Sequence, residues 1–169
     1  MELIGREHTS GRSLYALDAL RSDDIPRLLS VPSPYYVCLL AWDSRQASVA
    51  EIGTVVEFLI RSGCVYMCCW GPDCERVHDL FDEFEVEMRS PAESDDMCLM
   101  STWHTRDPLS EAIWFSLFLA QPHNAFANGC RSLVGVSVGS PEWAAEIRAA
   151  FADPAKLSKQ LGYGNDCRL

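Results

Sequence analysis

The sequence has little positive charge and almost no lysine. Its 169 residues contain 14 Lys and Arg, only two of them Lys, against 24 Asp and Glu, so the formal net charge is −10. Proteins that recognise nucleic acid or an anionic membrane neutralise phosphates with clustered basic side chains. The shortage of such side chains argues against nucleic acid and membrane surfaces as partners.

Long apolar runs are also missing. The longest lies between Glu111 and Gln121 and is interrupted by Ser116, whereas a membrane-spanning helix needs about 20 apolar residues. The first eight residues lack the basic end and apolar core that define a signal peptide. We therefore expect a soluble protein located in the cytoplasm.

The glycine-rich motifs of common nucleotide-binding enzymes are absent. Residues 42–48 contain no glycine, whereas a dinucleotide site needs glycines so that backbone amides can come close to the pyrophosphate. No G-x-x-x-x-G-K-[ST] loop occurs anywhere. A G-x-S-x-G pattern occurs at residues 135–139, but its Ser137 falls within the strand expected at 133–138 rather than at a turn into a helix. The segment from Asp43 to Arg45 also lacks the second aspartate of a D-x-D phosphatase. The sequence predicts no bound cofactor and favours a protein without catalytic activity.

Eight cysteines are present, but their positions do not indicate a disulfide framework. Cys38, Cys68, Cys69 and Cys98 lie within strand-like apolar runs, where a free thiol behaves as a small buried hydrophobe. Without an export signal, reduced cysteines are the expected state. Because neither C-x-x-C nor H-x-H spacing occurs, no metal site is predicted.

Apolar runs alternate with helical patterns, which predicts an α/β fold. Strands are expected at 35–42, 64–70, 97–103 and 133–138, with helices at 48–62, from 71, at 107–120 and at 140–151. Short connections of this kind imply right-handed crossovers, and nearly continuous apolar strands suit a sheet covered on both faces. We predict a three-layer, Rossmann-like domain with a mostly parallel sheet of about four to five strands flanked by helices.

The predicted domain covers the whole chain. Residues 1–34 form an irregular N-terminal segment, 35–152 the βα core, and 153–169 a C-terminal tail. Ser48 and Glu51 form a capping-box pattern at the start of one helix. Pro72, Pro108 and Pro141 each follow a small or capping residue, as is typical of the first turn of a helix.

Three of the five tryptophans, Trp42, Trp70 and Trp103, stand where strands are predicted to end. Ligands of open parallel sheets bind beyond these carboxyl ends. The indoles could close the top of the core, or they could wall a pocket for a small planar ligand. The ligand-binding candidates are Trp42, Asp43, Trp70, Asp73, Trp103 and His104.

Candidate catalytic residues lie at the same strand ends. Asp43 and His104 could act as acid and base in a hydrolase or transferase for a nucleotide-like planar substrate, with His104 oriented by Asp107. Asp107 could instead cap the following helix. Cys74 and His78 are one helical turn apart, and a helix N-terminus favours thiolate. They could form a nucleophile and its base, or simply extend the apolar face of their helix.

The negative charge is concentrated in one segment. Between Asp73 and Asp96 there are ten acids against Arg76 and Arg89, so the segment carries −8 of the total. On the predicted helix, four acids lie opposite the apolar face: Glu75, Asp79, Asp82 and Glu83. They could form a solvated surface or a docking surface for a basic protein partner.

The helix at 109–120 is apolar nearly all round, so it must be covered on both sides. Either other parts of the chain or a second subunit in a homodimer could supply the cover.

The favoured interpretation is a small acidic binding or interaction domain without catalysis, similar in composition to immunity or antitoxin proteins. The alternative is the hydrolase or transferase described above.

Overall fold

The computed structural model describes residues 1–88 and 98–163. Six strands form one sheet in the order β1-β2-β6-β3-β4-β5. All neighbouring strands are parallel except β1 and β2. The strands are β1 (Glu2–Arg6), β2 (Ser13–Ala19), β3 (Tyr35–Trp42), β4 (Cys64–Trp70), β5 (Met100–His104) and β6 (Cys130–Val138). The predicted α/β class is confirmed, with six strands in place of four to five.

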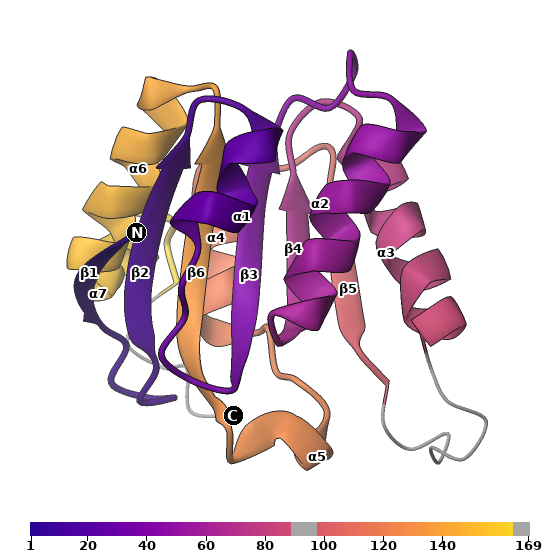
Figure 1. Ribbon diagram of the computed structural model, residues 1–169. Helices are drawn as coiled ribbons and strands as arrows, with labels where there is room; N and C mark the ends of the chain where they lie inside the picture. Colours follow the sequence, from indigo (N-terminus) through magenta and orange to yellow (C-terminus); the bar gives the residue numbers. More distant parts are fainter. Residues whose placement is uncertain (89–97, 164–169) are drawn as a thin grey trace.

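Helices cover both faces of this sheet and give the molecule three layers (Figure 1). One face carries η1 (Ser22–Asp24), α1 (Ile25–Leu28), α2 (Val49–Arg61) and α3 (Cys74–Met88). The other face carries α4 (Leu109–Phe118), α6 (Pro141–Ala152) and α7 (Pro154–Gln160). Each face buries its own cluster of apolar side chains, so the sheet is covered on both sides, as its apolar strands require.

The N-terminal segment is more regular than predicted. β2 joins the parallel ladder beside β6, and β1 adds an antiparallel edge with a shift in register between Leu3 and Gly5. The sequence hides both strands because β1 is largely exposed and Asp18 interrupts the apolar run of β2. β2 forms along the edge of β6, and β1 then pairs with β2.

The start of α2 shows half of the predicted capping box. The Ser48 hydroxyl accepts a hydrogen bond from the Glu51 amide at 3.1 Å. The Glu51 carboxylate instead accepts one from the Ser22 hydroxyl, which ties η1 to α2. Pro141 occupies the first turn of α6 as predicted, whereas Pro108 stands at the N-cap position of α4. The cap signals therefore located these helix starts to within one or two residues.

The C-terminal tail is helical in part, because α7 covers α4. The Trp114 indole N–H donates to the Ser158 hydroxyl at 3.1 Å, and its ring stacks on Tyr163 with centroids 4.0 Å apart. Ala112 and Ile113, on the same helix, are fully buried. The apolar surface of α4 is thus covered largely within one chain, and the fold does not require the homodimer considered for residues 109–120. None of the described helices is long and apolar enough to cross a membrane.

The connection between α4 and β6 does not overlie the carboxyl ends of the strands. It contains α5 (Asn124–Ala127), which lies at the opposite end of the sheet (Figure 1). The Tyr35 amide at the start of β3 donates to the Gly129 carbonyl just beyond α5. Any site at the carboxyl ends is therefore built from other loops.

Candidate functional site

A cavity of about 410 Å³ lies at the carboxyl ends of β2, β3 and β6. It occupies the point where the strand order reverses, since the chain leaves β3 towards β4 on one side while β6 lies on the other. Crevices at such switch points are the usual ligand sites of open parallel sheets. The lining residues are Leu20, Arg21, Ser22, Trp42, Asp43, Gln46, Glu51, Val138, Gly139, Ser140 and Trp143.

The loop after β6 is held against the end of β2. Gly139 has a positive φ of 72°, a conformation that glycine adopts without steric cost. Its amide donates to the Ala19 carbonyl at 2.8 Å. The turn places Ser140, the N-cap of α6, at the rim of the cavity, where α6 begins.

The aromatic walls of the cavity come from both layers of helices. Trp42 is 6% exposed and belongs to the core on the α1 to α3 face. Trp143, from the first turn of α6, packs against the core on the other face. Behind Trp143 stands Trp70, in edge-on contact with centroids 5.1 Å apart. The site therefore has two indoles at the cavity and a third supporting one of them.

This arrangement differs from a pocket walled by Trp42, Trp70 and Trp103. Trp70 and Trp42 face opposite sides of the sheet, since Trp70 pairs in register with Ala41, one residue before Trp42. Trp103 is 47% exposed and lies against His78 on α3. The sequence does not predict Trp143 as a site residue because it belongs to a helix. Its position just after the Ser140-Pro141 helix start is the one local signal for it.

Charged side chains of both signs lie at the cavity. Asp43 forms two hydrogen bonds with the Arg45 guanidinium, at 2.9 and 2.6 Å. These bonds hold the pKa of the Asp43 carboxyl below its usual value, so Asp43 is an anion at neutral pH and no general acid. The lining also contains Glu51 and Arg21, so with Arg45 two carboxylates lie beside two guanidinium groups.

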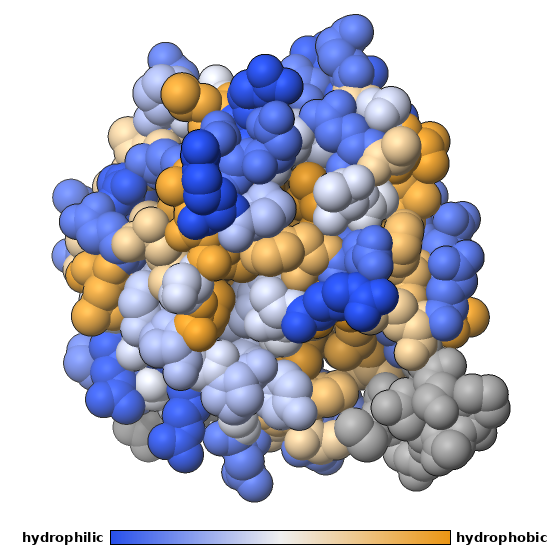
Figure 2. All heavy atoms as spheres, viewed as in Figure 1, coloured by the Kyte–Doolittle hydropathy of each residue, from blue (hydrophilic) through white to orange (hydrophobic). Residues whose placement is uncertain are grey.

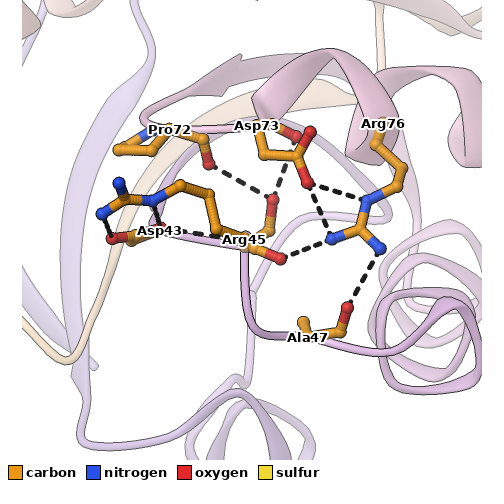
Figure 3. A network of polar contacts seen from close by, with 7 residues as sticks. Asp43, Arg45, Ala47, Pro72, Asp73 and Arg76 are labelled. Carbon is orange, nitrogen blue, oxygen red and sulfur yellow. Dashed lines mark hydrogen bonds and ion pairs between the residues drawn. The ribbon is translucent and has the colours of Figure 1, made fainter.

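Asp73 fastens two loops together and does not line the cavity. Its backbone has a positive φ of 66°, and its carbonyl accepts from the Ser44 hydroxyl at 3.0 Å. Arg76 donates to the Asp73 carboxylate and to the carbonyls of Ser44 and Ala47 (Figure 3). This network braces the loop after β4 against the loop after β3, and it engages the single arginine of α3.

Asp43 and His104 are not brought together. β4 lies between β3 and β5, so the ends of their strands are about 10 Å apart, two strand spacings. Asp43 lines the cavity and His104 does not. An acid–base site made jointly by these two residues is therefore not assembled.

His104 lies between the sheet and α4 and is paired with Asp107 in the following loop. Its Nδ1 lies 3.0 Å from the Asp107 carboxylate, and its ring packs edge-on against Phe115 at 4.9 Å. His104 is 8% exposed. Asp107 does not cap α4, because the N-cap position belongs to Pro108. His104 is buried but the Asp107 side chain is 51% exposed, so the pair links the end of β5 to the loop before α4 at the protein surface.

Cys74 and His78 do not form a nucleophile and base. Cys74 is 1% exposed, and burial raises the pKa of its thiol, which outweighs the thiolate expected from the helix N-terminus. Both ring nitrogens of His78 face carboxylates, those of Asp79 and Asp82. In the described part of the chain, no three His, Cys, Asp or Glu side chains are grouped to hold a metal ion.

We predict that Cys74 reacts slowly with alkylating agents. A buried thiol with a raised pKa offers little accessible thiolate. At pH 7.5, iodoacetamide labelling followed by peptide mass spectrometry should modify Cys74 in the folded protein at least tenfold more slowly than in the urea-unfolded chain. Labelling at the unfolded rate would show that Cys74 is accessible and would restore it as a candidate nucleophile.

The acidic side chains of α3 form an exposed face. Glu75, Asp79, Asp82 and Glu83 are all exposed, whereas Val77 and Phe81 are buried against the sheet. In Figure 2, hydrophilic residues cover much of the outer side of this helix. Three further acids of the segment, Glu93, Asp95 and Asp96, lie outside the described residues. The predicted acidic face is therefore exposed along α3, and its four residues do not line the cavity.

The sheet order, the helices on both faces and the cavity at the switch point define an α/β protein of the Rossmann-like class. Residues 15–154 match the family model described as Domain of unknown function (DUF7684), and the chain belongs to that family. No curated protein matches the chain.

Proposed function

We propose that this protein is a non-catalytic binding domain that holds a small planar molecule in the cavity at the ends of β2, β3 and β6. The observation that carries the proposal is the position of that cavity at the topological switch point, with Trp42 and Trp143 in its lining. Indoles supply flat apolar surfaces for stacking and N–H groups for orientation.

The lining favours a ligand without a phosphate group. The loop after β3 lacks the glycines that let backbone amides surround a phosphate, and the Arg45 guanidinium beside the cavity is already paired with Asp43. Carboxylate oxygens accept hydrogen bonds from ring N–H and amino groups, while Gln46 and Ser140 can donate or accept. These features fit a nucleobase or a similar nitrogen heterocycle that presents N–H donors.

A hydrolase or transferase using Asp43 and His104 is less well supported. The two residues belong to strands separated by β4, and His104 is already paired with Asp107. A catalytic acid and base must both reach the reacting atoms of one substrate. The binding proposal needs no such convergence.

The proposal is tested by titrating the protein with adenosine and guanosine while recording tryptophan fluorescence and thermal unfolding. We expect at least one nucleoside to bind, and its 5′-monophosphate to bind more weakly. Trp143→Ala should weaken binding about tenfold, because a base–aromatic stack is worth about 1–3 kcal/mol. The matched control is Trp103→Ala, an indole outside the cavity, which should leave affinity unchanged.

Two results would contradict the proposal. One is the absence of any nucleoside response up to millimolar concentration in protein that unfolds cooperatively. The other is equal weakening by Trp143→Ala and Trp103→Ala, which would place the ligand elsewhere. Tighter binding of the monophosphate than of the nucleoside would reject the ligand class inferred from the lining.

The cysteines support a cytoplasmic location as part of the same proposal. Seven cysteines lie in the described residues, and all of them are free. Six of the seven are buried, where they contribute to the core as small hydrophobic side chains. Free thiols in this number suit a reducing compartment.

A further inference from the structure

Within residues 1–88 and 98–163, the outer edge of β5 carries no further strand. Among the described residues, β5 pairs only with β4, and Met100 and Trp103 are 36% and 47% exposed. Its sequence, MSTWH, contains no lysine or proline, and its ladder has no bulge. Edge strands without these features can accept another strand through their free backbone groups.

The opposite edge of the sheet shows the contrast. β1 has a register shift between Leu3 and Gly5, and it begins and ends on charged residues. Its Glu2 carboxylate is held by Arg148. Bulges and charges of this kind discourage strand addition. The two edges therefore differ, and only β5 presents a regular ladder.

One side of the β5 edge is bordered by acidic groups. Ser101 donates to the Asp82 carboxylate at 2.5 Å, so its side chain points towards α3. The Trp103 ring lies 4.4 Å from the His78 ring, centroid to centroid, and His78 is flanked by Asp79 and Asp82. A side chain added beside Ser101 and Trp103 would therefore meet carboxylates and an exposed indole.

The helix beside this edge is strongly acidic. Residues 74–88 contain six Asp and Glu against a single base, Arg76, whose guanidinium is bound to the neighbouring loops. Two copies of this chain joined antiparallel at β5 would bring two such helices together, and like charges repel. The occupant that fits is a basic segment of another protein.

We propose that the β5 edge binds an extended segment of a partner protein with Arg or Lys at alternate positions, about five residues long. The backbone of the segment would continue the sheet. Because successive side chains of a strand alternate between faces, every second residue would lie on the α3 side. There the basic groups would meet Asp79 and Asp82, and an arginine would stack on the free face of Trp103. This proposal is independent of the cavity.

The test uses a synthetic peptide with arginine and valine alternating over seven residues, labelled for fluorescence anisotropy. We expect binding that weakens with added salt, and new hydrogen-exchange protection of β5 amides in the complex. Asp79→Asn combined with Asp82→Asn should reduce affinity about five- to tenfold. Glu142→Gln, an exposed carboxylate on α6, is the matched control and should have no effect.

Backbone methylation of the peptide separates strand addition from simple charge attraction. Only alternate amides of an added strand face the sheet edge. N-methylation of one set, either the arginines or the valines, should abolish binding, whereas methylation of the other set should be tolerated. The net charge is the same in both peptides.

Three outcomes would overturn the proposal. Equal effects of the two methylated peptides would show attraction without strand pairing. Undetectable binding at low salt by the folded protein would show that the edge does not accept the segment. Protection of β5 amides without peptide, in a particle with the mass of two chains, would assign the edge to self-association.

Discussion

Replacement of Gly71 by alanine is expected to lower the free energy of unfolding by about 3–5 kcal/mol. Gly71 follows β4 with a positive φ of 117°, and a Cβ atom there would lie 2.5 Å from the Trp42 carbonyl oxygen. That oxygen belongs to the backbone of β3, which is held between β4 and β6. Neither the turn at Gly71 nor the backbone of β3 can move without breaking strand pairing. The steric clash with the Trp42 carbonyl and the backbone strain at positive φ therefore both lower the stability of the variant.

Gly162→Ala is the matched control for this substitution. Gly162 also has a positive φ, of 80°, but no atom lies within 4 Å of the position its Cβ would take. It should lose only about 1–2 kcal/mol, from the backbone conformation alone. Urea unfolding followed by tryptophan fluorescence measures both variants. Equal losses would show that the turn after β4 does not press against Trp42.

Phe81→Ala is expected to cost about 3–5 kcal/mol, the usual range for truncating a fully buried phenylalanine. The Phe81 side chain is 0% exposed, on the face of α3 that packs against the sheet. Removing it leaves a cavity between α3 and the strands. Since the acidic face belongs to the same helix, this variant should also loosen the surface beside β5.

Val86→Ala provides the comparison on the same helix. Val86 is 69% exposed, and alanine has the higher helix propensity, so stability should change by no more than about 0.5 kcal/mol. Denaturant unfolding and amide exchange in α3 would measure the difference. A loss below about 1 kcal/mol for Phe81→Ala would mean that α3 is not anchored by this side chain.

The interior strands could be read from the sequence because burial leaves a local signal. The predicted ranges 35–42 and 64–70 coincide with β3 and β4. A strand covered on both faces needs apolar residues at nearly every position, so its limits appear directly as an apolar run. β1 is largely exposed and the exposed Asp18 interrupts β2, and β2 pairs with β6, more than 100 residues away.

The predicted ligand-binding residues and the residues that line the cavity overlap only in part. Trp42 and Asp43 were identified because they end a clear strand, and both line the cavity. The sequence does not predict three other lining residues, Arg21, Ser140 and Trp143. They reach the cavity only because β2 and β6 lie beside β3 in the folded chain. His104 was included because it ends a strand, but sequence position does not show that β4 separates it from Asp43.

The amino-acid sequence by itself determined the α/β class, the interior strands, the helix starts and the acidic character of α3, because periodicity, capping and charge act over a few residues. Strand order was decided only by the tertiary structure. The strand order determines which loops meet at the switch point. It therefore places Trp143 rather than Trp103 at the cavity and leaves β5 at the edge of the sheet. These properties depend on contacts between distant segments, and no local pattern of residues encodes them.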